Sequence, residues 1–244
     1  MRTKSLLPLF LISVMALPSM LWGQNYSLSF DGEDDYVSTG IPYTALLDAE
    51  EISISVLFKW LSQDSDGGPP QQGILANSSS GNQQFAFLVD ASFDDGEKKL
   101  SLSWPDGYAL FDYEIINFGE WYNIKVILSE NFVYWYLNDL LVETDNVTFT
   151  TLGTESTNVP DLTIGWGNQF YDTYFHGLID NLSISINDGN MIGEWNFNEG
   201  TGTTLTDLTS NDNDGTIYGA TWSTDVPVSG CTDPYADNYD SDAT

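Results

Sequence analysis

The sequence predicts an all-β protein folded as an antiparallel β-sandwich. Apolar and polar residues alternate in several short runs, which is the period of strands with one face in a core. Clusters of Gly, Asn, Asp and Ser separate these runs at the spacing typical of sandwiches and jelly rolls. No window shows sustained helical periodicity, and the best helix candidate is one short turn at residues 43–47.

The strands can be placed in order along the chain. The clearest runs over residues 52–60, where apolar side chains occupy alternate positions: Ile52, Ile54, Val56, Phe58 and Trp60. Further strands are predicted at residues 85–89, 100–104, 121–128, 132–137 and 162–164, with loops at 63–72, 94–98, 151–160 and 167–173. Asn138 and Asp139 separate two apolar runs and predict a tight hairpin turn.

Residues 174–186 predict a strand that opens with a carboxylate in an apolar setting. Leu182, Ile184 and Ile186 alternate with polar residues, and Asp180 stands where that core face begins. A buried carboxylate without a partner is costly. Because the whole chain holds only six Lys and Arg residues, the partner is expected to be a metal ion or backbone N–H groups.

Residues 1–23 predict a secretory signal peptide. Arg2 and Lys4 precede an apolar run that Pro8 and Pro18 interrupt, and no basic stop-transfer flank follows it. These features favour cleavage over a transmembrane anchor, and no later segment is long and apolar enough to span a bilayer. We therefore expect a protein that is secreted or displayed at the cell surface, with no membrane insertion of the mature chain.

The charge balance limits the classes of partner. The chain has a formal charge of −30, and loss of the signal peptide leaves four lysines against 36 acidic residues, a net charge near −32. Such a charge excludes nucleic acid and anionic membranes as partners. It fits divalent cations as counter-ions and a salty exterior that screens self-repulsion.

Cys231 is the only cysteine of the chain. In a secreted protein a single cysteine suggests a free thiol, an intermolecular bridge or a missing partner. Residues 230–240 resemble a short cysteine-bearing repeat of secreted bacterial proteins, in which a second cysteine follows shortly after the point where this chain stops. We therefore expect residues 227–244 to be a linker and the start of a truncated repeat.

Four segments, in order, resemble a laminin G-like domain of the concanavalin A-like lectin superfamily. The opening Tyr-Ser-Leu-Ser-Phe-Asp-Gly-Glu-Asp-Asp-Tyr-Val at residues 26–37 matches the start of that domain. The strand at 52–60, the hairpin at 134–142 and the closing strand at 175–186 follow in the order of the family. The resemblance implies a concanavalin A-like jelly roll, which we place at residues 24–226.

Residues 191–226 also resemble this family, although in many relatives the equivalent segment precedes the Phe-Asp-Gly opening. One interpretation is the start of a second domain, but the cysteine-bearing tail follows too soon for that. We favour a permuted order in which these strands fold back beside the N-terminal strand. The apolar residues Trp195, Phe197, Ile217 and Trp222 would then complete the same core.

The resemblance also implies a structural calcium ion where the first and last strands meet. Asp180 stands at the position of a contributing Asp in relatives, and Asp31 with the carbonyl of Gly32 would add oxygen ligands from the facing strand. The alternative is that Asp31 caps the Asp-Gly turn while Asp180 accepts backbone N–H bonds. A second acidic cluster at residues 207–214 is read as a turn.

Two aromatic segments are candidate sugar-binding sites, since lectin-like sites use aromatic faces with polar side chains for hydroxyl groups. Residues 165–172 contain Trp166, Asn168 and Tyr171, and Trp104 begins a second candidate at residues 104–108. The alternative for each ring is burial in the core.

No catalytic residues are predicted. Glucanases on this fold use Glu-x-Asp-x-x-Glu, but after Glu143 and Asp145 the place of the third acid is taken by Thr148 or Phe149. The chain has no Gly-x-Ser-x-Gly motif for the nucleophile of a serine triad. Its one histidine, His176, is too few for a His/Cys zinc site. We expect a non-catalytic binding or adhesion module for a glycan or a cell-surface component. The alternatives are a polysaccharide-degrading enzyme or its accessory domain, and a structural spacer in a large surface protein.

Overall fold

The protein is described as a computed structural model that covers residues 25–61, 71–79, 82–90, 98–111, 116–152, 160–167 and 173–227. The expected signal peptide, Cys231, Asn168 and Tyr171 lie outside these described residues. The strands are β1 (Ser27–Asp31), β2 (Tyr36–Ser38), β3 (Ile52–Trp60), β4 (Gln71–Ser79), β5 (Asn82–Asp90), β6 (Lys99–Trp104), β7 (Gly107–Phe111), β8 (Trp121–Leu128), β9 (Phe132–Leu137), β10 (Leu140–Asn146), β11 (Thr163–Ile164), β12 (His176–Ile186), β13 (Asn190–Trp195), β14 (Thr204–Leu205), β15 (Gly215–Tyr218) and β16 (Thr221–Ser223). A short 3-10 helix, η1 (Tyr43–Leu46), occupies the position of the predicted helical turn.

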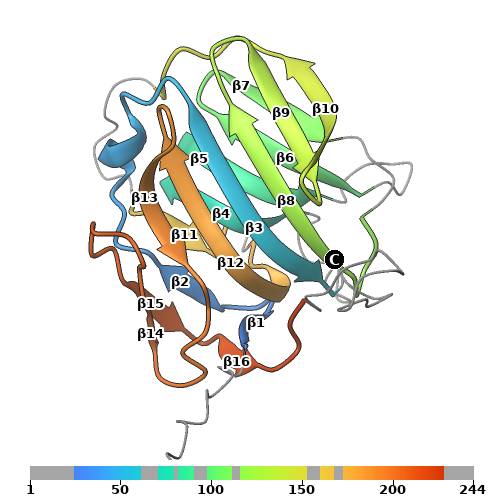
Figure 1. Cartoon of the computed structure of the whole chain (residues 1–244), viewed down its shortest axis with the longest axis vertical. Coiled ribbons are helices and arrows are strands. Elements are labelled where there is room, and N and C mark those ends of the chain that lie inside the picture. The colour runs from blue at the N-terminus through green and yellow to red at the C-terminus, as the bar shows by residue number, and fades with distance from the viewer. Residues whose placement is uncertain are drawn as a thin grey trace, which may run out of the picture.

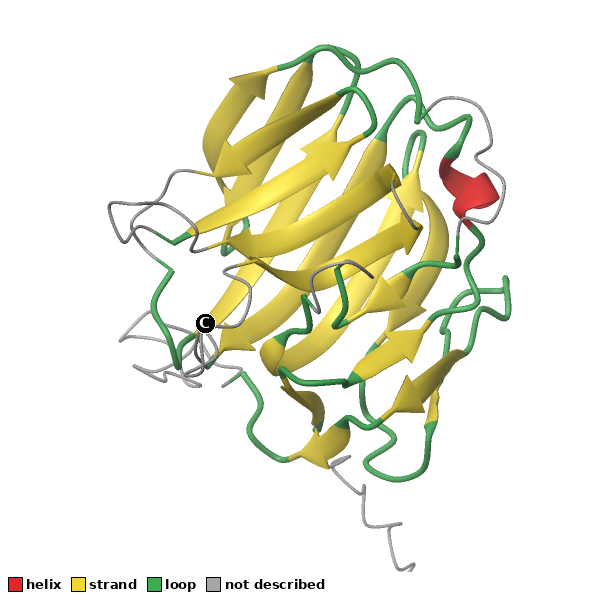
Figure 2. Ribbon diagram, turned by 180° about the vertical axis from the view of Figure 1, so that it is seen from behind, coloured by secondary structure: helices red, strands yellow, loops and turns green. Residues whose placement is uncertain are grey.

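Two antiparallel sheets lie face to face, which confirms the predicted sandwich (Figures 1 and 2). Sheet A has the order β10-β9-β8-β3-β12-β1-β16, with β13 also paired to β12, and it faces the viewer in Figure 1. Sheet B has the order β14-β15-β2-β11-β4-β5-β6-β7 and faces the viewer in Figure 2. Within the described residues no helix has the length and apolar character needed to cross a bilayer.

Period-2 patterning places the core between the sheets. In β3 every second residue from Ile52 to Trp60 is buried at 1% exposure or less, while the residues between them are only half-buried. β12 likewise buries Leu182 and Ile184 in the core. Full burial of such a side chain contributes about 1.5–3 kcal/mol, so these two strands supply much of the force that holds the sheets together.

The predicted hairpin turn joins β9 to β10. Leu137 pairs with Leu140, and the two residues between them, Asn138 and Asp139, have φ values of 49° and 65°. Positive φ at both central positions is the signature of a type I′ turn, whose twist matches that of the flanking strands. Asn tolerates this conformation well, which explains why the sequence turns here.

The C-terminal strands belong to the same two sheets as the N-terminal ones. β16 pairs with β1, and β15 pairs with β2, where Tyr218 lies opposite Tyr36. β13 extends the edge of β12 that β1 leaves open, with Trp195 opposite Leu182. Trp195, Phe197 and Ile217 lie in the core, and Trp222 packs against it.

Candidate functional site

Four aromatic side chains form a row on the outer face of sheet B. Tyr218 stacks on Tyr36 with ring centroids 4.7 Å apart and an interplanar angle of 14°. Tyr36 packs at 48° on Trp166, 5.4 Å away, and Trp166 stacks on Tyr174 at 5.6 Å and 8°. We call these four residues the aromatic row.

Strand alternation explains why the row faces outward. Val37 and Ile217 point into the core, so their neighbours Tyr36 and Tyr218 point away from it, and the register of β2 and β15 sets the two tyrosines opposite each other. Trp166 and Tyr174 are joined by an isolated antiparallel bridge next to β11. Cross-strand aromatic pairs of this kind contribute about 0.5–1.5 kcal/mol each beyond their buried area, so the row is a rigid feature.

Exposure differs along the row. Tyr36, Trp166 and Tyr174 are half-buried, whereas Tyr218 at the end of the row is 46% exposed. Trp166 has a ring neighbour on either side, so it is not the open platform that the sequence suggested. The most exposed ring of the row is instead that of Tyr218.

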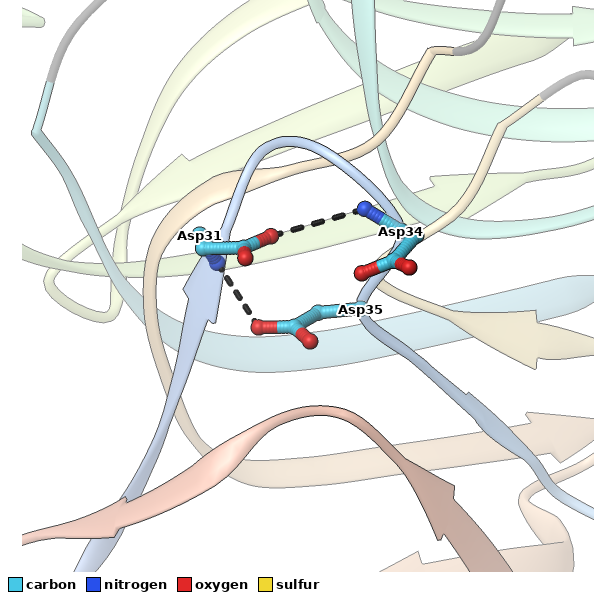
Figure 3. A group of neighbouring side chains, drawn as sticks. All are labelled: Asp31, Asp34 and Asp35. Atoms are coloured by element: carbon cyan, nitrogen blue, oxygen red, sulfur yellow. Dashed lines mark hydrogen bonds between the residues drawn. The ribbon is translucent and has the colours of Figure 1, made fainter.

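The turn between β1 and β2 carries a group of carboxylates next to the row (Figure 3). The side chains of Asp31, Asp34 and Asp35 each offer one oxygen within 4.8 Å of the others. Oδ1 of Asp31 accepts the backbone N–H groups of Glu33 at 2.8 Å and Asp34 at 3.5 Å. This is the turn-capping role that the sequence offered for Asp31 as the alternative to calcium. We call residues 31–35 the acidic turn.

Asp35 fixes the acidic turn to the end of the aromatic row. Its Oδ2 accepts the Asp31 N–H at 2.9 Å, and a Cβ at Gly219 would lie 1.9 Å from its Oδ1. Gly219, with φ of 77°, is therefore required next to Tyr218 both for its conformation and for the close approach of Asp35. Burial raises the pKa of the Asp35 carboxyl, the Asp31 N–H bond opposes this, and the charges of Asp31 and Asp34 raise the pKa further.

Asp180 lies away from the acidic turn. In the pairing of β1 with β12, Asp31 faces His176 and Leu28 faces Ile179, so Asp180 is level with the start of β1. Four residues along an extended strand span about 13 Å. Calcium ligands lie about 2.3–2.6 Å from the ion, so the predicted joint site of Asp180 with Asp31 and Gly32 is wrong because the register separates its members.

The Asp180 carboxylate is fully buried at a bulge in β12. Asn181 and Leu182 together lie opposite one residue of β3, so β12 carries one extra residue there, and Asn181 takes a φ of 44°. Oδ1 accepts the Asn181 N–H at 2.8 Å, as the sequence alternative predicted, while Oδ2 has no hydrogen-bond partner. Burial raises the pKa of Asp180 to about 7, although the Asn181 N–H bond lowers it.

Comparison with known proteins agrees with this architecture. Residues 31–187, more than half of the chain, match a laminin G family model described as the concanavalin A-like lectin/glucanases superfamily. The chain belongs to this superfamily. The prediction from the four ordered segments is thereby confirmed, together with the jelly-roll fold.

Two solved structures show the same fold. A candidate carbohydrate binding protein from Bacteroides ovatus matches 84% of this chain with 12% identity and a TM-score of 0.63, and the chain spans 61% of that protein. A carbohydrate-binding module, CBM40, of a Ruminococcus gnavus IT-sialidase, bound to alpha2,3 sialyllactose, matches 68% of this chain and 94% of its own length, with 13% identity and a TM-score of 0.50. No curated protein sequence matches the chain.

Trp104, the second predicted sugar platform, is a core residue in this concanavalin A-like domain. It is 6% exposed, packs edge-on against Phe149 at 6.2 Å, and lies against Gly107, where a Cβ would come within 2.7 Å of the indole. The prediction for Trp104 is wrong because its strand, β6, turns this face inward. Tyr108, four residues later, is 69% exposed.

The acidic residues that begin like a glucanase motif serve the hairpin instead. Asp145 on β10 accepts the indole N–H of Trp135 at 2.8 Å, which ties its carboxylate to the neighbouring strand.

The cluster at residues 207–214 is a turn, as expected. Asp207 accepts the backbone N–H groups of Glu194, Thr209 and Asn213 at 2.9–3.1 Å. Burial raises its pKa, and these bonds outweigh burial and hold the pKa below its usual value.

A pocket of about 280 Å³ opens at the other end of β12 from the acidic turn. Its lining is polar and consists of Glu50, Glu51, Ser129, Glu130, Asn187 and Asp188. Asn187 holds the wall in place, because its Oδ1 accepts the N–H groups of both Glu50 and Glu51. Without an aromatic wall the pocket offers a sugar no ring to stack on, which leaves the aromatic row as the better candidate.

Sequence reasoning found Trp166 but missed the other members of the row. Tyr36 and Tyr218 are 182 positions apart and meet only because β15 pairs with β2. The alternation of Tyr218 with the core residue Ile217 was a signal that its ring faces outward. The identity of its neighbour requires the strand order, which the residue pattern of β15 does not contain.

Proposed function

We propose that this protein is a secreted or cell-surface, non-catalytic module that binds a glycan on the outer face of sheet B. The observation that carries the proposal is the aromatic row, which ends in the exposed ring of Tyr218. A pyranose ring presents an apolar face to such aromatic surface and hydroxyl groups to nearby carboxylates. The acidic turn supplies those carboxylates beside Tyr36.

The structural relatives support the proposal. The Bacteroides ovatus protein and the Ruminococcus gnavus module are both described as carbohydrate-binding, and both share the jelly roll. A role in adhesion to a cell-surface component would use the same site. An appendage of a polysaccharide-degrading enzyme would use it too, with catalysis located elsewhere.

The test is binding to a glycan array followed by titration of the strongest ligand against wild type, Tyr218→Ala and Tyr108→Ala. We expect Tyr218→Ala to weaken binding at least about tenfold, since loss of an aromatic hot-spot contact typically costs about 2 kcal/mol or more and about 1.4 kcal/mol is tenfold. Tyr108→Ala is the matched control, because this exposed tyrosine lies on a different strand. Equal losses in both variants would reject the aromatic row as the site. An array without any binder would favour a structural spacer.

We further propose that the acidic turn holds a structural calcium ion. Three carboxylates with oxygens within 4.8 Å of one another support this proposal, because calcium takes carboxylate and backbone oxygens as ligands. The carbonyl of Gly32 stays a candidate ligand in this smaller site, and Asp180 does not belong to it.

A further inference from the structure

The acidic turn gives the proposed glycan site a concentrated negative charge. Four carboxylates, those of Asp31, Glu33, Asp34 and Asp35, occupy five consecutive positions, and the first three residues of this set are exposed. Asp35 leads directly into Tyr36 of the aromatic row. Any ligand that stacks on the Tyr36 and Tyr218 end of the row therefore meets this charge.

None of the four lysines among the described residues lies on β2 or β15, the strands that carry Tyr36 and Tyr218, and each lies against a partner outside the aromatic row. Lys59 is 2.8 Å from Asp225 on sheet A, and Lys125 lies over the Tyr136 ring. Lys98 lies over the Phe118 ring, and Lys99 pairs with Asp90 in the β5–β6 ladder. β6 is three strands from β11 in sheet B, about 14 Å away, which exceeds the Debye length of about 8 Å at physiological salt.

The one histidine near the turn does not reverse this charge. His176 lies opposite Asp31, and its Cβ would be 2.9 Å from a Cβ at Gly32. A protonated imidazole would add one positive charge against four carboxylates. One bound divalent cation would likewise leave the turn negative.

On the basis of the proposed glycan-binding role, we infer that the site selects uncharged glycans and rejects glycans that carry carboxylate or sulfate groups. An anionic group held beside the aromatic row is repelled by the acidic turn, and the four lysines of the described residues lie on other strands or against other partners. The negative charge does not lower the affinity for an uncharged sugar, whose hydroxyl groups can donate hydrogen bonds to Asp31 and Asp34. In this the site differs from the Ruminococcus gnavus module, whose structure holds a sialylated ligand.

The test compares each neutral glycan that binds on an array with the same glycan after sialylation or sulfation, at about 0.05 M and about 0.5 M NaCl. We expect the neutral form to bind equally well at both salt concentrations. The acidic form should bind at least about tenfold more weakly at low salt and should recover part of that loss at high salt. Calcium and a chelator are each included, and an acidic form that binds as tightly as the neutral form when calcium is present would overturn the inference.

The charge-reversed variant Glu33→Lys provides the second arm, because Glu33 is exposed and is not one of the carboxylates assigned to the ligand or to calcium. We expect it to bind the acidic glycan more tightly than wild type does and to leave affinity for the neutral glycan within about twofold. Wild-type preference for the acidic member of a pair would overturn the inference and leave the proposed glycan-binding function standing. Failure to bind any glycan, neutral or acidic, would overturn both.

Discussion

Asp225 reaches across the outer face of sheet A to Lys59, with Oδ2 2.8 Å from the lysine Nζ. Its Oδ1 accepts the indole N–H of Trp121 at 3.1 Å, and its backbone carbonyl accepts the Ser27 hydroxyl at 2.6 Å. One residue just after β16 thus contacts β1, β3 and β8. Burial raises the pKa of Asp225, and the bonds from Lys59 and Trp121 outweigh burial and lower it.

Asp225→Ala is expected to destabilise the fold by about 1 kcal/mol, because a partly exposed ion pair and one indole bond are lost. The loss should shrink as salt screens the pair. Because the folded-state pKa is lowered, the stabilisation is present above the ordinary Asp pKa and is lost as pH falls through the folded value. Urea unfolding at pH 7 and pH 3 checks this, with the exposed Asp161→Ala as control. The same free energy of unfolding for the two variants at pH 7 would contradict the role of Asp225.

The buried Asp180 carboxyl should make the free energy of unfolding depend on pH in the opposite direction. Its pKa is raised to about 7, so between about pH 4 and pH 7 the folded protein binds more protons at this group than the unfolded chain does. The contribution of Asp180 to the free energy of unfolding therefore falls as pH rises through this window and is constant above it. From pH 5 to pH 8 the fall should exceed about 1 kcal/mol, with roughly 3 kcal/mol as its upper bound.

Asp180→Asn isolates this contribution from the repulsion among the other carboxylates. The variant keeps an oxygen for the Asn181 N–H and removes the charge. We expect the variant to gain stability over wild type at pH 8 and to gain less at pH 5, measured by urea unfolding at each pH. Parallel pH profiles for the two proteins would show that Asp180 does not titrate in this window.

The type I′ turn between β9 and β10 offers a stabilising substitution. Asp139 holds a φ of 65°, which costs an L-residue energy that glycine does not pay. Asp139→Gly should stabilise the protein by about 0.5–1 kcal/mol, and Asp139→Ala should destabilise it, since alanine lacks the side chain that helps Asp tolerate this region. Thermal unfolding of the three proteins measures both changes. A loss of stability in Asp139→Gly would mean that the Asp side chain contributes more than the backbone strain costs.

The local pattern of residues was sufficient to predict those features that depend only on neighbouring positions in the chain. The burial of alternate residues in β3, the hairpin at Asn138 and the single turn of η1 each follow from neighbouring residues. The site depends on pairing between distant segments, and there the pattern was insufficient. Asp31 and Asp180 both belong to strands that adjoin, but only the register shows that they lie at different levels.

The burial of individual aromatic rings was the second feature that the sequence could not predict. Trp104 and Trp166 have similar surroundings in the sequence, with polar residues and glycine nearby, yet one ring packs in the core and the other joins the aromatic row. Which of the two rings is exposed depends on the sheet face that each strand turns outward and on the loops that cover it. Neither is encoded in a window of a few residues.

The acidic turn predicts stabilisation by calcium that is independent of Asp180. At a concentration 100 times the dissociation constant, a calcium ion bound only by the folded state would add about 2.7 kcal/mol. Asp34→Asn should weaken this response, because Asp34 offers an oxygen to the ion and its carboxylate accepts no hydrogen bond within the turn. Asp180→Asn should retain the full response. Melting temperatures with calcium and with chelator test the prediction, and identical melting of the wild type in both would exclude a calcium ion in the acidic turn.

Removal of the C-terminal strands should unfold the whole domain. A chain that ends at residue 189 loses β13 to β16, and with them the buried side chains of Trp195 and Phe197. Loss of a buried Trp or Phe side chain costs about 3–5 kcal/mol each, and two such losses are comparable to the whole stability of a typical domain, about 5–15 kcal/mol. The truncation would also expose the edges of β1 and β2, which invites aggregation. Circular dichroism and size-exclusion chromatography of the truncated chain measure the outcome.

Trp222→Ala serves as the milder comparison, because this ring only packs against the core and its loss should cost less stability than the loss of either buried ring. A stable, monomeric truncated chain would show that β13 to β16 form a separate unit and that residues 25–189 fold without them.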